Sequence, residues 1–139
     1  MTIKAHLKWT DELQFVARIG QGPAVILDST DGASGASPMQ LVLMGVAGCA
    51  AIDIVVILKK KRVQLSRFEI EIEGVQAREN PKRFTKMVVT YILAGKGIKP
   101  KAVEQAIELS ETKYCSAMAS VNAEVEHTYQ IVESGSSII

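Results

Sequence analysis

The chain has 139 residues, of which 47% are apolar, and its 16 Lys and Arg against 15 Asp and Glu give a formal net charge of +1. This length predicts one domain over residues 1–139, and the near-neutral charge argues against a nucleic-acid partner. Two cysteines are too few for a disulfide scaffold or a four-cysteine zinc site. Because the N-terminus lacks an apolar signal core, we expect a cytoplasmic protein, and the high apolar content favours a large subunit interface.

Three short strands are predicted in the N-terminal part of the chain. Apolar and polar side chains alternate over residues 2–9 and again over residues 13–18, which is typical of half-buried strands. A third strand is predicted at residues 25–27, after a break that contains glycine and proline. Their tight connections predict an antiparallel meander. Residues 28–37 predict a loop, whose glycines lack the spacing and the lysine of a phosphate-binding fingerprint.

A long helix is predicted after this loop, and its two ends are well marked. Ser37 is a capping residue, Pro38 suits the first helical position, and Gln40 completes a capping box with Ser37. At the other end, the basic run from Lys59 to Arg62 complements the negative end of the helix dipole.

Between Leu41 and Leu58 this helix is apolar on nearly every side, with Cys49 and Asp53 as its only ionisable residues. Such a helix is either buried in a protein or spans a membrane. Asp53 lies near the middle of the helix, and the flanking segments have apolar faces that need an element to pack against. Both observations favour a helix buried in the protein over one that spans a membrane. Small residues are predicted to let other backbones approach closely around the cysteine: Gly45, Ala47, Gly48, Ala50 and Ala51.

The C-terminal part predicts two further strands, a helix and a last strand. Residues 65–73 and 84–94 alternate and are joined by a hairpin connection, and the second strand is predicted to be covered on both sides. Pro100 opens a helix that ends at Cys115, and residues 121–131 alternate again. The tail, residues 133–139, is predicted to be frayed.

The order of elements therefore predicts an α+β fold. Antiparallel sheets would pack on the long central helix, and a second subunit would cover the apolar surface that remains.

The two cysteines are the leading candidates for chemistry. A thiolate that attacks a peroxide becomes a sulfenic acid, which a second cysteine resolves as a disulfide. Cys49 and Cys115 are either such a redox pair or two buried small apolar residues. Asp53, one turn beyond Cys49, would oppose thiolate formation. Arg18 is a candidate for the activating cation, and its alternative is a solvated arginine on an edge strand.

Other chemistries have weaker support in the sequence. A cysteine hydrolase needs an imidazole at the thiol, but His6 falls on a polar strand face, and His127 falls on an apolar face that predicts a hydrogen-bonded core histidine. The spacings do not suggest a zinc site, so no metal is predicted.

Two segments together resemble the OsmC/Ohr family of osmotically inducible and organic hydroperoxide resistance proteins. They are SPMQLVLMGVAGCAAIDIVVILKKKR at residues 37–62 and TKYCS at residues 112–116. The run GCAAIDIVVILKKKR, together with NPKRFTKM at residues 80–87, is similar to the YhfA-like branch.

The resemblance implies an intertwined homodimer with a thiol site and no metal or organic cofactor. It implies that Cys49 attacks the hydroperoxide and that Cys115 resolves the product. Peroxidases of the family pair an arginine, for which Arg18 is the counterpart, with a glutamate early in the central helix. In this chain Met39 stands at the position of that glutamate and Gln40 follows it.

Two functions are therefore expected as alternatives. The first is thiol-dependent reduction of organic hydroperoxides, in which Cys49, Cys115 and Arg18 are catalytic and a dithiol is the reductant. The second is a non-catalytic module that binds a small apolar ligand. Met39, Gln40 and Met44 are the predicted lining of the substrate pocket, and in the binding module the apolar pocket is predicted to be lined by Met39, Met44 and Cys49.

Overall fold

The computed structural model describes residues 1–133, so the predicted frayed tail lies outside the described residues except for Glu133. The chain divides into two compact units, Met1–Val42 and Leu43–Ile139, and each is described by itself. The prediction of a single domain over residues 1–139 stays a prediction.

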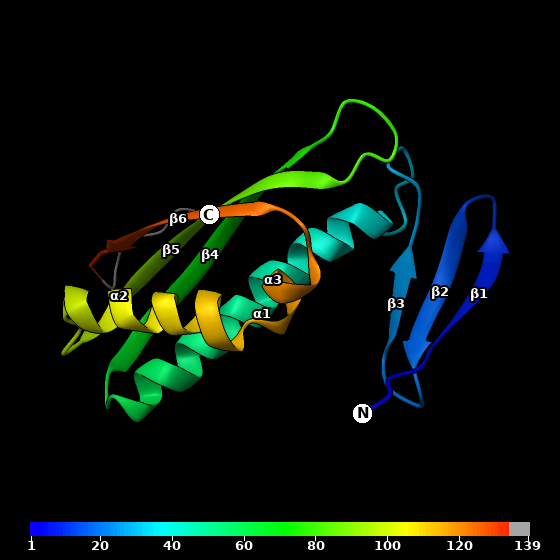
Figure 1. Ribbon diagram of the computed structural model, residues 1–139. Coiled ribbons are helices and arrows are strands. Elements are labelled where there is room, and N and C mark those ends of the chain that lie inside the picture. Colours follow the sequence, from blue (N-terminus) through cyan, green and yellow to red (C-terminus); the bar gives the residue numbers. More distant parts are fainter. Residues whose placement is uncertain (134–139) are drawn as a thin grey trace. The chain divides into compact units, whose positions relative to one another are not determined.

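The first unit contains a three-stranded antiparallel sheet in the order β1 (Ala5–Asp11), β2 (Gln14–Ile19) and β3 (Ala24–Leu27), shown in blue in Figure 1. The predicted meander is confirmed. The predicted half-burial of the first strand is wrong, because β1 is exposed along its whole length. Among the residues of the first unit, no helix or second sheet covers this sheet, apart from the first turn of the helix that begins at Pro38.

Helix α1 (Pro38–Lys60) begins and ends as the sequence predicts. The Gln40 backbone N–H donates to the Ser37 hydroxyl at 3.2 Å, and the Ser37 N–H donates to the Gln40 side-chain oxygen at 2.9 Å. This reciprocal pair is the capping box. Arg62, the last residue of the predicted basic run, has the left-handed conformation (φ 61°) that closes a helix C-terminus.

The second unit contains a sheet in the order β4 (Gln64–Gln76), β5 (Phe84–Lys96) and β6 (Glu124–Ile131). β4 and β5 form the predicted antiparallel hairpin, but β6 pairs with β5 in parallel. The prediction of antiparallel sheets is therefore wrong for this strand. The reason is the connection, because α2 (Pro100–Leu109) carries the chain back along the sheet before β6 begins.

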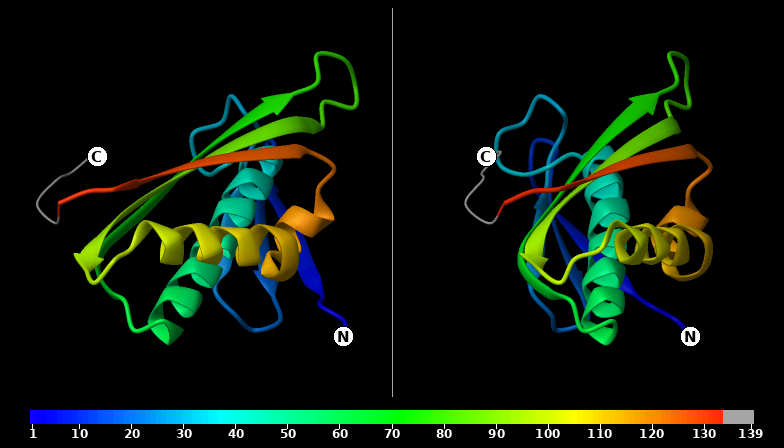
Figure 2. Two further views of the ribbon diagram at one scale, coloured as in Figure 1. Left: turned by 60° about the vertical axis from the view of Figure 1, so that its left-hand side comes forward. Right: turned by 90° about the vertical axis from the view of Figure 1, so that its left-hand side faces the viewer.

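Helices cover one face of this sheet in the second unit. The part of α1 beyond Val42 and helix α2 lie on the same side of the three strands in all views (Figures 1 and 2). The side chains of β5 that share this face are fully buried: Met87, Val89, Tyr91 and Leu93. Ile92 and Ala94, on the opposite face, are buried as well, so the C-terminal half of β5 is covered on both sides as predicted.

Gly74 of β4 shows how closely α1 approaches the sheet. A Cβ at this position would lie 2.5 Å from the Phe84 ring and 2.9 Å from a methyl group of Leu43. Such contacts are far shorter than van der Waals separations, so only glycine fits here between strand and helix.

Only one face of α1 is buried in the single chain. The buried residues recur at helical spacing: Val46, Ala47, Ala50, Ile54 and Leu58. Large apolar side chains remain exposed on the other faces: Val42, Met44, Ile52, Val55 and Val56. The single chain therefore buries one face of the helix and leaves apolar surface over, as predicted; that a second subunit covers this surface stays a prediction. A Cβ added at Gly45 or Gly48 would meet nothing within 4 Å, so the tight surroundings predicted for these two glycines are missing.

By length and composition, α1 is the one helix among the described residues that could cross a membrane. A core helix that packs on a sheet meets the same criteria. The expectation that the protein does without a membrane stays a prediction.

Candidate functional site: two cysteines and an aspartate

The fold of the second unit brings together two cysteines that are far apart in the sequence. The sulfur atoms of Cys49 and Cys115 and a carboxylate oxygen of Asp53 all lie within 4.8 Å of one another. Cys49 and Asp53 are one turn apart on α1, so the helix points both toward the same neighbour. Both cysteines are free thiols. The structure therefore assembles the predicted pair and places Asp53 beside it.

A turn of π-helix, η1 (Ser110–Tyr114), sets the position of Cys115. The Cys115 backbone N–H donates to the Ser110 carbonyl at 2.7 Å, which closes the wide turn between α2 and α3 (Ser116–Ser120). Single π turns are often found at functional sites. The Cys115 side chain is directed toward α1, where its sulfur lies 4.0 Å from the Val46 carbonyl oxygen, and the residue is only 4% exposed.

A side-chain hydrogen bond joins the two elements that carry the cysteines. The Ser110 hydroxyl, fully buried, donates to Oδ2 of Asp53 at 2.9 Å. Hydrogen bonds to an ionised acceptor are stronger than those between neutral groups. This bond therefore helps to fix η1, and with it Cys115, against α1.

The two thiols stand in different surroundings. Burial raises the pKa of Cys115 to about 11; the hydrogen bond with Cys49 and the negative charge of Asp53 act in the same direction, against a backbone hydrogen bond from Met118. Cys115 is therefore protonated at neutral pH. Cys49 is only partly buried, so it is the thiol that solutes reach more easily.

Glu111 of η1 is bound to the sheet through both carboxylate oxygens. The buried Tyr91 hydroxyl donates to Oε2 at 3.2 Å, and Nδ1 of His127 lies 3.0 Å from Oε1. Burial, followed by the charge of Glu111, strongly raises the pKa of Tyr91, so its hydroxyl keeps its proton. His127 is hydrogen-bonded as predicted, but it is exposed rather than in the core, because β6 is an edge strand.

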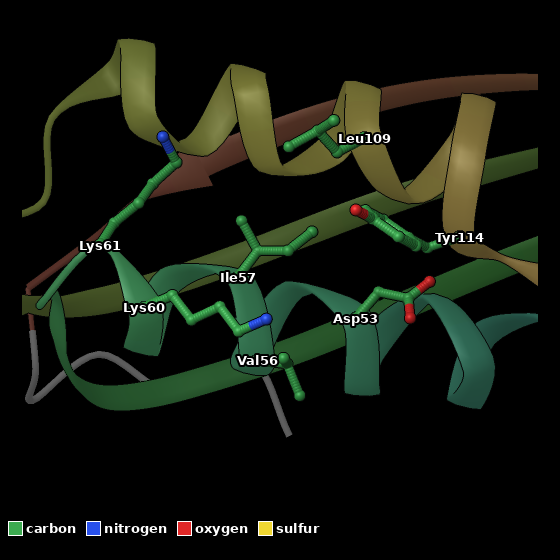
Figure 3. A pocket seen from close by; sticks show the side chains of 7 residues that line it. All are labelled: Asp53, Val56, Ile57, Lys60, Lys61, Leu109 and Tyr114. Atoms are coloured by element: carbon green, nitrogen blue, oxygen red, sulfur yellow. The ribbon is translucent and has the colours of Figure 1, made fainter.

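A cleft of about 450 Å³ begins beside the cysteine pair and runs between α1 and the α2–η1 segment. Figure 3 shows the side chains that line it: Asp53, Val56, Ile57, Lys60, Lys61, Leu109 and Tyr114. The walls are apolar, Asp53 lies at the end next to the sulfur atoms, and the two lysines lie at the C-terminal end of α1. The cleft can therefore hold a molecule with an apolar body beside Asp53.

The other predicted site residues belong to the first unit, apart from Met44. Arg18 is exposed on β2 in the first unit, where it lines a second cleft with His6, Lys8 and Thr10. Met39 and Gln40 lie in the first turn of α1, also in the first unit, and Gln40 is engaged in the capping box. Met44 is half exposed on α1. Their roles at the cysteine pair stay predictions.

Sequence reasoning missed Ser110, Glu111 and the lining of the cleft. Ser110 offered a signal, since it is a polar residue on the apolar stripe of its helix and buried polar groups need partners. Its partner, Asp53, is distant in the sequence, and no local pattern links the two.

Comparisons with known proteins agree with this architecture. A family model described as OsmC-like protein matches residues 30–130. Protein YhfA of Escherichia coli K12 is 34% identical over 132 residues, which cover 94% of this chain and 98% of the relative. A hypothetical protein from Aquifex aeolicus has a similar structure, with a TM-score of 0.81 at 28% identity over 96% of this chain and 99% of that one.

A more distant structure carries a functional name. The organic hydroperoxide resistance protein OhrB of Bacillus subtilis has a TM-score of 0.63 at 17% identity, over 94% of this chain and 98% of that one. At this identity the likeness concerns the fold.

Proposed function

Because the chain belongs to the OsmC-like family, we propose that it reduces organic hydroperoxides with a two-cysteine site in which Cys49 attacks and Cys115 resolves. The observation that carries the proposal is the approach of the two sulfur atoms to within 4.8 Å of each other. A disulfide needs about 2.05 Å between its sulfurs, so a small side-chain movement closes the gap.

The two cysteines are oxidised to a disulfide in two steps. The Cys49 thiolate attacks the outer oxygen of the hydroperoxide, the O–O bond breaks, and the alkoxide leaves as an alcohol after it takes up a proton. The resulting sulfenic acid on Cys49 is attacked by the sulfur of Cys115, which forms a disulfide and releases water. A dithiol reductant then returns both cysteines to thiols.

The different environments of the two thiols support this division of roles. Because a thiolate is the nucleophile, Cys115, with its pKa raised to about 11, is a poor group for the first attack, on the hydroperoxide, at neutral pH. In the second step its thiol proton leaves with the hydroxyl of the Cys49 sulfenic acid as water. Cys49 is the more accessible thiol. In the proposal, Arg18 stabilises the Cys49 thiolate, and the chain works as a cytoplasmic homodimer in which a second copy covers the exposed apolar side chains of α1.

The cleft beside Asp53 supports an apolar substrate. Val56, Ile57 and Leu109 suit the alkyl body of a hydroperoxide, while Lys60 suits a carboxylate at its far end. We therefore assign alkyl and lipid hydroperoxides, rather than hydrogen peroxide, as the substrate class.

A non-catalytic ligand-binding module is the second candidate. Met39 at the position of the family glutamate favours it, and the cleft beside Asp53, which neither Met39 nor Met44 lines, would hold the ligand. Binding of a fatty acid that is unchanged in Cys49→Ser would support this candidate.

The test treats reduced protein with one equivalent of cumene hydroperoxide and follows free thiols and intact mass. The proposal predicts that both thiols are lost and that an intramolecular Cys49–Cys115 disulfide forms. Cys115→Ser is the matched control and is expected to stop at a sulfenic acid on Cys49, which a sulfenic-acid reagent traps. If both thiols of the wild type survive, the peroxidase proposal fails and ligand binding becomes the leading candidate.

A further inference from the structure

The cysteine pair and Asp53 form a cluster of ligand-type atoms as well as a redox pair. The ligand atoms of Cys49, Asp53 and Cys115 lie within 4.8 Å of one another. In a tetrahedral zinc site, with bonds of about 2.3 Å to sulfur and about 2.0–2.2 Å to oxygen, neighbouring ligand atoms are roughly 3.5–3.8 Å apart. The three groups therefore need to close by about 1 Å to surround an ion.

We propose that the reduced chain binds one thiophilic divalent cation, such as Zn²⁺, through Cys49, Cys115 and Asp53. Two thiolates and a carboxylate select a soft or borderline ion and discriminate against Mg²⁺ and Ca²⁺, which require oxygen ligands. The bound ion replaces the two thiol protons, which are released to the solvent.

The surroundings hold the ligands in place from both sides. Cys49 and Asp53 are fixed one turn apart on α1, while the π turn fixes the backbone of Cys115 through its 2.7 Å bond to Ser110. The Ser110 hydroxyl donates to Oδ2 of Asp53, and this bond fixes the carboxylate beside the two sulfur atoms. Hydrogen bonds of this kind, behind the ligands, orient metal sites and raise their affinity.

The site also has room for a fourth ligand. Cys49 and Asp53 are partly exposed, and Asp53 lines the solvent-open cleft between α1 and η1 (Figure 3). Three protein ligands and one water molecule complete a tetrahedral zinc site of the open type. The ion is therefore able to enter and leave without unfolding of the chain.

Metal binding has a direct consequence for the thiols. An ion that holds both sulfur atoms prevents Cys49 from attacking a peroxide and prevents formation of the disulfide. The inference concerns the same residues as the proposed peroxidase, but its direct readout is metal binding and does not require that activity.

The experiment titrates reduced protein with Co²⁺ in the absence of oxygen and follows the thiolate-to-cobalt absorption, and then displaces the cobalt with Zn²⁺. We expect one equivalent per chain, displacement by Zn²⁺ but not by Mg²⁺, and protection of both thiols from alkylation by Zn²⁺. Protein oxidised to the disulfide is expected to bind no cobalt.

Two variants test the geometry. Ser110→Ala keeps all three ligands and is expected to lower the affinity about 10–100-fold, as loss of a supporting hydrogen bond does in other metal sites. Asp53→Asn is expected to weaken binding while it leaves both thiols in place. Glu108→Gln, an exposed change on α2, is the matched control and leaves the affinity unchanged.

The outcomes separate this inference from the proposed function. Absence of cobalt–thiolate absorption in folded, reduced wild type overturns it, and so does an affinity that neither Ser110→Ala nor Asp53→Asn alters. Cobalt binding by a protein that consumes no hydroperoxide supports the metal site and overturns only the peroxidase.

Discussion

The hydrogen bond between Ser110 and Asp53 gives the sharpest test of how the site is held together. Ser110→Ala removes a fully buried hydroxyl that donates to the carboxylate at 2.9 Å. A hydrogen bond to a charged group contributes about 1.5–3 kcal/mol, so the free energy of unfolding is expected to fall by that amount. Since about 1.4 kcal/mol is a factor of ten, the unfolding constant rises about 10–100-fold.

Urea unfolding of the reduced proteins measures this change, and a double-mutant cycle with Asp53→Ala isolates the bond. A coupling energy of about 1 kcal/mol or more is expected between these contacting residues. Ser116→Ala is the control, because Ser116 is exposed and such a change alters stability by at most about 0.5 kcal/mol.

A second readout links the bond to the site. Since it joins α1 to η1, its loss is expected to let Cys115 move away from Cys49 and to slow disulfide formation after peroxide treatment. Additive effects in the cycle, to within about 0.5 kcal/mol, together with an unchanged rate of disulfide formation, would refute the reasoning.

Three further predictions concern other parts of the second unit. Glu111→Ala leaves the buried Tyr91 hydroxyl without its acceptor and is expected to cost about 1–3 kcal/mol of stability in urea unfolding. Alkylation of Cys115 in Cys49→Ser protein is expected to stay slow at neutral pH, because burial raises the pKa of the Cys115 thiol. The further change Asp53→Asn removes a nearby negative charge, so it is expected to lower this pKa and to speed the alkylation. Lys60→Met is expected to raise KM several-fold for a carboxylated hydroperoxide and to leave cumene hydroperoxide unaffected, as steady-state kinetics would show.

The raised pKa of Cys115 also predicts how stability depends on pH. Because the folded-state pKa of about 11 lies above the ordinary value of 9.0, the thiol's contribution is fully present below pH 9 and is lost as pH rises through about 11. The loss of melting temperature over this range is expected to be smaller in Cys115→Ser than in wild type.

Three results would contradict these expectations. Stability lost equally in Glu108→Ala, an exposed change nearby, would mean that the bonds of Glu111 contribute nothing specific. Rapid alkylation of Cys115 at pH 7 would contradict the effect of its burial. An equal rise in KM for both hydroperoxides would show that Lys60 does not recognise a carboxylate.

The sequence was sufficient where a feature depends on residues close together in the chain. The capping box at Ser37, the hairpin of β4 and β5 and the end of the α2–η1 helical segment before Cys115 follow from short-range hydrogen bonding and side-chain periodicity. The family resemblance rested on two such segments, and the family is confirmed.

The sequence was not sufficient where distant segments meet. The direction of β6 depends on the path of the crossover helix, and alternation alone is the same for parallel and antiparallel strands. Burial of α1 depends on what packs against each face, so the all-apolar pattern predicted that apolar surface is left over but not that Ile52 and Val56 are among the side chains that carry it.

The sequence alone therefore determined the types and approximate limits of the main helices and strands, and it singled out the two cysteines as the leading candidates for chemistry. Only the tertiary structure brought Cys115 next to Cys49, placed the Ser110 hydroxyl on Asp53 and opened a cleft beside them. The physical reason is that local patterns record which face of an element is apolar. The distance between side chains on different elements depends instead on how those elements pack, which in this site includes a π turn between α2 and α3.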